Sequence, residues 1–186
     1  FSTIAASSVS STTGTTGTTD KITIEGSSGV LTRDIISISV LATNTATNYK
    51  VTINDYSSIG DSAFHLYRNL VEASIGESIE SIGASAFSYC IGLTTVTIGN
   101  TVKTIGDNAF QGCSGLTTVT IGDSVTSIGA NAFQGCKSLS SINQDTNGKN
   151  TLPDKVTSIG ERAFQDCSGL TNLLIPDSVK SIGANA

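Results

Sequence analysis

The residues of this chain best suited to metal or redox chemistry are its four cysteines, Cys90, Cys113, Cys136 and Cys167. Zinc sites bring cysteines together in C-x2-C pairs, often with histidines. Here the spacings are 23, 23 and 31 residues, and His65 is the only histidine in the sequence. A disulfide needs side chains that converge, whereas equivalent positions of a repeat point in parallel. We therefore predict four free, buried thiols that pack as small apolar groups.

No pattern in the sequence indicates catalysis. His65 has no neighbouring nucleophile in a recognisable motif, and we predict that it faces solvent. The glycines lie in Ile-Gly pairs rather than in a phosphate loop of the form G-x-x-x-x-G-K-[ST]. We predict a non-enzymatic protein that has no catalytic residues, no cofactor-binding residues and no cofactor.

Acidic residues recur at one turn position and are the remaining candidates for ion binding. With one asparagine, the set is Asp55, Glu77, Asn100, Asp123, Asp154 and Asp177. Asp and Asn bond their own backbone in turns, which explains most of the set. Carboxylates stacked one strand spacing apart also repel each other, and a calcium ion would relieve that repulsion. Asp123, Asp154 and Asp177 are therefore weak calcium candidates beside the turn interpretation.

A 23-residue repeat positions all of these residues. The unit L-T-T-V-T-I-G-x-x-V-x-x-I-G-x-x-A-F-Q-G-C occurs twice in succession from Leu93, and its Ile-Gly pair returns at Ile59, Ile82, Ile105, Ile128, Ile159 and Ile182. A fixed period of this length is typical of a solenoid. We predict a leucine-rich repeat solenoid of about six coils, with a parallel sheet on one face and short helical turns or loops on the other.

The segment L-x-x-V-x-I of each unit alternates apolar and polar residues, as a strand does. Val96 and Ile98 are expected to point into the core, and Thr95 and Thr97 to point outward. Stacked coils then form a flat, nearly neutral face rich in hydroxyl groups. We predict that this face binds an extracellular protein or glycan through Thr95, Thr97, Thr118, Thr120, Ser141, Asn143 and Asn172. Its two T-x-T rungs also resemble those of ice-binding solenoids, but the other rungs break the array.

The segment after each Ile-Gly pair is expected to form the outer wall. Asp107 is placed to cap a short helical turn that carries Ala109, Phe110 and Cys113. Each coil buries several apolar side chains in this scheme, and a neighbouring coil must cover them. Stability is therefore expected to be a property of the stack.

The chain divides into three predicted parts. Residues 1–20 are nearly all Ser, Thr, Gly and Ala, a composition that predicts an arm or linker. Residues 21–48 contain two alternating segments and are predicted to form a β-strand cap. Residues 49–186 are the predicted solenoid, and within it residues 143–151 form a polar insertion that should leave the coil undisturbed.

The repeat of I-P/G-D-S-V-x-S-I-G-x-x-A-F-x-x-C-x-x-L, seen from Ile121 to Leu139 and in part from Ile175 to Gly183, resembles the BspA-like leucine-rich repeats, also called the Treponema pallidum type. The resemblance covers about three quarters of the chain, from Tyr49 onward. It implies a surface or secreted protein, often an adhesin for host matrix proteins or other cells, and it carries no catalytic residues. The eroded repeat around Tyr67, the insertion and the Ser/Thr-rich start depart from the pattern.

Composition narrows the partners further. Charged residues make up 13% and the net charge is −5, which disfavours a nucleic-acid surface. No apolar run is long enough to span a membrane. Abundant Ser and Thr, few charges and an acidic pI favour an extracellular or cell-surface location.

An alternative role is a structural subunit that assembles head to tail into a filament. The last repeat stops one residue before its expected phenylalanine, at Ala186, and leaves Ile182 beside an open end. Phe1 and Ile4 of a neighbouring copy could supply the missing apolar groups in such an assembly. The competing interpretation is a fragment of a longer chain, and the absence of methionine at residue 1 fits a processed or partial product.

Overall fold

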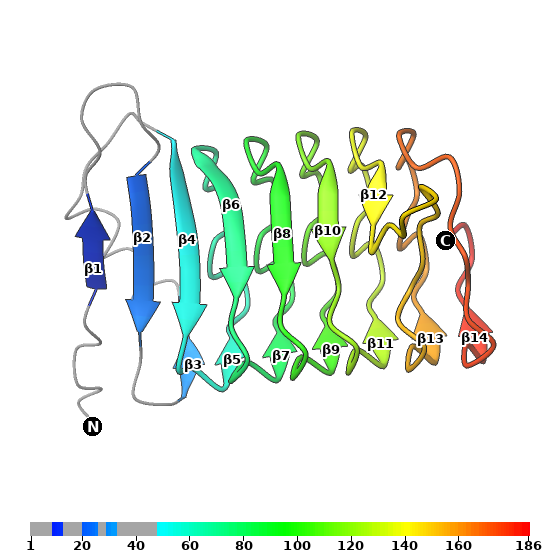
Figure 1. Cartoon of the computed structure of the whole chain (residues 1–186), viewed down its shortest axis with the longest axis horizontal. Coiled ribbons are helices and arrows are strands. Elements are labelled where there is room, and N and C mark those ends of the chain that lie inside the picture. Colours follow the sequence, from blue (N-terminus) through cyan, green and yellow to red (C-terminus); the bar gives the residue numbers. More distant parts are fainter. Residues whose placement is uncertain (1–8, 13–19, 26–28, 33–47) are drawn as a thin grey trace.

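The computed structural model describes residues 9–12, 20–25, 29–32 and 48–186. It is a parallel-sheet solenoid whose coils lie side by side along one axis (Figure 1). The predicted repeat architecture of about six 23-residue coils is confirmed. Two sheets run along the stack and share one continuous core.

The first sheet carries the predicted strands. In spatial order it contains β1 (Val9–Thr12), β2 (Asp20–Glu25), β4 (Tyr49–Asn54), β6 (Leu70–Ile75), β8 (Thr95–Ile98), β10 (Thr118–Thr120) and β12 (Ser141–Ile142). All neighbours pair in parallel except β1, which is antiparallel to β2. Val96 and Ile98 are buried, and Thr97 is exposed. The predicted inward and outward alternation is therefore confirmed.

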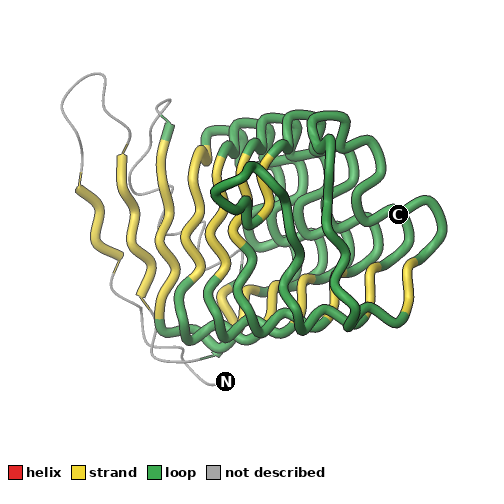
Figure 2. Tube along the Cα trace, turned by 45° about the vertical axis from the view of Figure 1, so that its right-hand side comes forward, coloured by secondary structure: helices red, strands yellow, loops and turns green. Residues whose placement is uncertain are grey.

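The second sheet is formed by the short segments that end in the Ile of each Ile-Gly pair. It contains β3 (Val30–Leu31), β5 (Ser58–Ile59), β7 (Ser81–Ile82), β9 (Thr104–Ile105), β11 (Ser127–Ile128), β13 (Ser158–Ile159) and β14 (Ser181–Ile182). The Ile-Gly pairs marked the repeat in the sequence, but this second sheet was not predicted. Figure 2 shows the two rows of strands with the connecting turns between them.

The outer wall contains no helix in the described part of the chain, so the predicted helical turn is wrong. Asn108 has a positive φ of 58°, and Ser85, Asn131 and Arg162 repeat this conformation in other coils. Backbone N–H groups here alternate between two kinds of partner: Asn108 N donates to Ala130 O of the next coil at 2.8 Å, whereas Ala109 N donates to Gly106 O within the same turn at 3.3 Å. Left-handed residues cannot continue an α-helix, and the next coil accepts every second hydrogen bond.

Asp107 has a different role from the predicted helix cap. Its Oδ1 accepts a hydrogen bond of 2.7 Å from the backbone N–H of Ala130, one coil further on. Asp61 accepts the same bond from Ala84. These carboxylates join neighbouring coils, so the capping prediction for Asp107 is wrong.

A column of phenylalanines fills the core. The rings of Phe64, Phe87, Phe110, Phe133 and Phe164 stack with centroids 4.8 to 5.4 Å apart and planes within 7° of parallel. The first four are fully buried. Each contributes a large apolar area that is covered only when the adjacent coil is present.

The four cysteines form a second column, and they are free and buried, as predicted. Each thiol donates to the carbonyl oxygen of the Phe in the preceding coil, at 3.0 to 3.2 Å. Burial raises the pKa of the Cys113 thiol well above its ordinary value. The Cys113 thiol is thus a protonated packing group.

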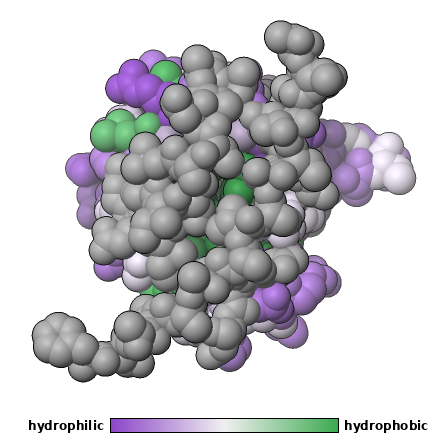
Figure 3. Space-filling view, turned by 90° about the vertical axis from the view of Figure 1, so that its left-hand side faces the viewer, coloured by the Kyte–Doolittle hydropathy of each residue, from purple (hydrophilic) through white to green (hydrophobic). Residues whose placement is uncertain are grey.

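At the opposite end from β14, the predicted arm and cap contribute β1, β2 and β3 to the two sheets. The space-filling view from this end shows mainly hydrophilic described residues around the rim (Figure 3). The boundaries at residues 20 and 48 stay predictions. No helix that could cross a membrane is found in the described ranges.

Candidate binding face

The outward side of the first sheet carries two rows of hydroxyl groups. One row contains Thr23, Thr52, Ser74, Thr97 and Thr120, and the other contains Thr95, Thr118 and Ser141. The parallel register places each side chain beside its equivalent on the next strand, at a spacing of about 4.8 Å. We call the surface formed by Thr95, Thr97, Thr118, Thr120 and Ser141 the hydroxyl face. The outward direction predicted for these five residues is confirmed, whereas binding by them is a prediction.

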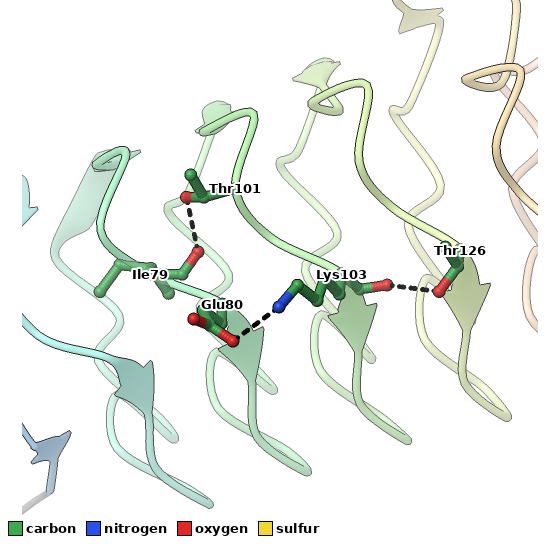
Figure 4. Close-up of polar contacts among 5 residues, drawn as sticks. All are labelled: Ile79, Glu80, Thr101, Lys103 and Thr126. Atoms are coloured by element: carbon green, nitrogen blue, oxygen red, sulfur yellow. Dashed lines mark hydrogen bonds and ion pairs between the residues drawn. The ribbon is translucent and has the colours of Figure 1, made fainter.

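Hydroxyl groups elsewhere in the coil have a structural role. The Oγ1 atoms of Thr94 and Thr117 donate to backbone carbonyls of the preceding coil at 2.9 and 3.0 Å. Thr126 donates in the same way to Lys103 O at 3.1 Å, beside the Lys103–Glu80 ion pair (Figure 4). These side chains tie the coils together, and their hydroxyl protons are occupied.

The hydroxyl face differs because its hydroxyl groups remain available. In the described part of the chain, no hydrogen bond engages the hydroxyls of Thr95, Thr97, Thr120 or Ser141. Thr118 has a single long contact of 3.5 Å, to Thr117. An exposed hydroxyl can both donate and accept hydrogen bonds, so this surface offers free donors and free acceptors to a ligand.

The two rungs before the hydroxyl face carry charge. Lys50 Nζ lies 2.6 Å from Glu72 Oε2, and both side chains are well exposed. An exposed pair of this kind contributes little to stability. It does mark the point where the charged part of the sheet gives way to the neutral rungs that begin at Thr95.

The insertion closes the other end of the hydroxyl face. In Figure 1 it is the loop between β12 and β13. Asn143 Oδ1 accepts from Ile121 N at 2.7 Å, and its Nδ2 donates to Ile121 O at 2.9 Å. The Asn143 amide thus replaces the strand that would otherwise continue the sheet beside Ile121. Its polar atoms hold the protein rather than a ligand.

Asn150 likewise replaces a missing strand partner, here beside Ile142 on the next strand. It is only 1% exposed, and its Oδ1 accepts from Ile142 N at 2.9 Å. Its Nδ2 donates to Ser140 O and Asn172 O, while Asn172 Oδ1 accepts from Asn150 N at 2.9 Å. A buried amide satisfied in this way fixes the loop base. The sequence alone gave no signal for Asn150, and Asn172 is part of the same network.

The loop tip is organised by Asp145. Its Oδ1 accepts from the backbone N–H groups of Asn147 and Lys149, both at 2.8 Å. The hydrogen bond from Lys149 N is the main cause that lowers the pKa of the Asp145 carboxyl. Gly148, with a φ of 77°, completes the turn.

A hollow of about 730 Å³ lies between the hydroxyl face and this loop. Its lining includes Thr97, Thr118, Thr120 and Ser141 from the strands, Asn143 and Gln144 from the insertion, and Glu77, Asn100, Asp123 and Asp154 from the turns. Among the described residues that line it, none is basic or aromatic. Its volume is sufficient for a small ligand or for one segment of a larger one.

The acidic set at the turns forms another ladder between coils. Glu77 Oε2 accepts from Asn100 N at 2.8 Å, and Asn100 Oδ1 accepts from Asp123 N at 3.2 Å. These side chains accept hydrogen bonds from the backbone of the next coil rather than from their own turn. They therefore have a structural role between coils in addition to the role in turns that the sequence predicts. Among the residues that the structure describes, no three His, Cys, Asp or Glu side chains gather as metal ligands. Calcium binding by Asp123, Asp154 and Asp177 stays a prediction.

His65 is half-buried rather than solvent-facing, so that prediction is wrong. Its Nδ1 lies 2.5 Å from Ser88 Oγ, and its ring meets the edge of the Tyr89 ring at 6.1 Å. Both partners come from the next coil. The next coil therefore covers the His65 side chain, although His65 lies in the eroded repeat around Tyr67.

The predicted self-assembly residues are only partly visible. Phe1 and Ile4 lie outside the described residues. Ile182 is 58% exposed on the last coil, together with Leu174 and Ile175. Ala186 is half-buried, and its carbonyl accepts from Phe164 N at 2.9 Å.

The comparisons with known proteins agree with this architecture. The family model "BspA type Leucine rich repeat region" (6 copies) matches residues 147–186. A leucine-rich repeat protein from Eubacterium ventriosum is 25% identical with a TM-score of 0.64; the match covers 76% of this chain and 42% of that one. This chain thus spans about two fifths of that protein's length.

A second similar structure is the T. pallidum leucine-rich repeat protein, at 22% identity and a TM-score of 0.64. That match covers 97% of this chain and 80% of the other. At this identity it supports the fold alone. No curated protein sequence matches the chain significantly.

Proposed function

Because this chain carries BspA-type leucine-rich repeats, we propose that it is a non-enzymatic binding module that works outside the cell or on its surface. The hydroxyl face and the insertion beside it form the contact surface for an extracellular protein or glycan. Repeat solenoids use such extended sheets for binding. The acidic, weakly charged and Ser/Thr-rich composition supports the extracellular location.

One observation carries the proposal. The hydroxyls that tie coils together are occupied, whereas the side-chain hydroxyls of Thr95, Thr97, Thr120 and Ser141 make no hydrogen bond within the described part of the chain. Hydroxyl groups that do not stabilise the fold are available to a partner. The rigid sheet also holds them in place, so that binding orders few side chains.

The test uses the double variant Thr97→Arg and Thr120→Arg, which fills the hydroxyl face with two long charged side chains. Both residues are exposed, so the fold should remain intact. The matched control is Ser114→Arg, an exposed position on the outer wall. Binding to a panel of purified extracellular-matrix proteins is measured by surface plasmon resonance. We expect the double variant to lose binding and the control to keep it; equal binding by both would place the contact surface elsewhere.

A second candidate function is head-to-tail assembly. Leu174, Ile175 and Ile182 are 47%, 37% and 58% exposed on the last coil. The cover for such a surface is apolar, whether it is a further coil of the same chain or a second copy. Sedimentation velocity at increasing concentration tests self-association. Removal of residues 1–4 should abolish polymers if Phe1 and Ile4 supply the contact, and unchanged polymers would contradict that mechanism.

A further inference from the structure

The hydrogen-bonding groups of the hollow restrict the chemistry of its ligand. Thr97, Thr120 and Ser141 present hydroxyls that can donate and accept, while Asp123 and Asp154 present carboxylates that only accept. The described lining of the hollow contains no lysine or arginine. A ligand that engages all of these polar groups at once must donate to the carboxylates and must also accept from the hydroxyls.

Three ligand classes fail this requirement. An anionic ligand would face Glu77, Asp123 and Asp154 in a chain whose net charge is −5. A cationic group would satisfy the carboxylates, but it has no acceptor for the threonine hydroxyls. An apolar ligand would displace water from both kinds of group without replacing its hydrogen bonds.

A sugar hydroxyl, in contrast, donates one hydrogen bond and accepts others. We propose that the hollow is a subsite for a neutral saccharide, free or carried by a glycoprotein. The inference rests on the proposed function of the hydroxyl face and names the ligand class for it. Gln144, exposed on the loop, lines the same hollow; its Nε2 donates one hydrogen bond to Gly148 O at 3.1 Å, and its second N–H and its Oε1 can still donate and accept.

The register of the sheet indicates how such a ligand lies. Thr97 pairs with Thr120, and Thr118 pairs with Ser141, so each hydroxyl row runs across the strands. Successive hydroxyls are one strand spacing apart, about 4.8 Å. A saccharide laid along the solenoid axis therefore meets hydroxyls of both rows on successive strands. The insertion, held by Asn143 and Asn150, stops it at one end.

The direct test measures binding of three neutral hexasaccharides with different linkages, maltohexaose, cellohexaose and N-acetylchitohexaose, by isothermal titration calorimetry. A heparin-derived hexasaccharide is the anionic comparison. We expect at least one neutral sugar to bind at millimolar concentration or below and the anionic one not to bind. No heat from any neutral sugar, or equal affinity for the anionic sugar, would overturn the proposal.

The matching variant is Thr97→Val with Thr120→Val, which removes two hydroxyls and keeps the side-chain shape. Because neither hydroxyl bonds another residue in the ranges that the structure describes, the melting temperature should not change. Each lost hydrogen bond should weaken sugar binding about 2- to 10-fold, and the pair should act together. Thr126→Val is the control, since its hydroxyl serves Lys103 outside the hollow. Unchanged sugar affinity in the double valine variant would refute the subsite.

A further arm separates this inference from the proposed function. The same matrix proteins are tested for binding before and after enzymatic removal of their glycans. Loss of binding on deglycosylation supports the saccharide subsite. If the arginine variant abolishes binding but deglycosylation has no effect, the face binds protein and the saccharide inference is wrong. If neither change affects binding, both proposals fail.

Discussion

Replacement of Gly122 by alanine tests how closely the coils approach each other. A Cβ atom at Gly122 would lie 2.2 Å from Gly99 O and 2.6 Å from Gly99 C, and both are backbone atoms of the preceding coil. Real Cβ atoms essentially never come within 3.0 Å of another heavy atom. The two coils must therefore separate locally by about 1 Å, which stretches ladder hydrogen bonds beyond useful length. We expect the free energy of unfolding to fall by about 3 kcal/mol or more, the upper end for overpacking.

The matched control is Gly135→Ala, which adds the same methyl group on the outer wall. Gly135 has a φ of 73°, but the nearest atom to its Cβ position is 3.8 Å away. The equivalent position in other coils holds Leu66, Tyr89 and Asp166, each also with positive φ. Only the conformational cost of about 1 kcal/mol then applies. Equilibrium urea unfolding compares the two, and a loss for Gly122→Ala no larger than for Gly135→Ala would refute the close-approach argument.

Four other measurements test the structure. Asn150→Ala should lower the unfolding free energy by about 2 to 3 kcal/mol, because it leaves buried backbone groups unsatisfied, whereas Asn147→Ala at the exposed loop tip should change it by less than about 0.5 kcal/mol. The thiols should resist Ellman's reagent at pH 8 until urea unfolds the chain, and Cys167, whose pKa burial raises to about 11, should react before the more deeply buried Cys113. The hydrogen bonds from Lys149 N and Asn147 N lower the pKa of the Asp145 carboxyl, so they stabilise the loop above the ordinary pKa of 3.8 and are lost as pH falls through the folded pKa. The amide resonance of Asn147 should therefore titrate with a midpoint below 3.8. Millimolar calcium should raise the melting temperature relative to chelator if the turn carboxylates bind it only in the folded state, and equal melting temperatures would contradict calcium binding.

The sequence predicts the solenoid because its signal is repeated in every coil. The Ile-Gly, Ala-Phe and Cys positions recur together, so a chance match at one position does not change the predicted repeat. Alternation over Thr95, Val96, Thr97 and Ile98 similarly predicts which side chains enter the core, and the structure confirms it. Free thiols follow from the same reasoning, since equivalent positions point in parallel.

Features that depend on contacts between coils were harder to predict. The second sheet consists of two-residue strands such as Thr104–Ile105, which are too short to show a period. The helical turn after Asp107 was a reasonable local expectation, but the next coil offers its backbone carbonyls at closer range. The amides of Asn143 and Asn150 replace missing strand partners, a role that exists only because the insertion interrupts the first sheet.

Contacts between coils also decide which residues of the candidate site are available to a ligand, and the sequence does not show these contacts. Thr94 and Thr95 are adjacent and chemically identical, yet the Thr94 hydroxyl bonds Val71 O in the preceding coil and the Thr95 hydroxyl bonds nothing in the described protein. Composition therefore overstates the binding surface, because it counts structural and available hydroxyls together. Pairing register separates them: the residue before the strand reaches back to the neighbouring coil, and the outward residues within the strand do not. A repeat of this kind can vary Thr95, Thr97 and their equivalents while Thr94 and Thr117 continue to hold the coils together, so under the proposed function ligand specificity would change at these outward positions without loss of stability.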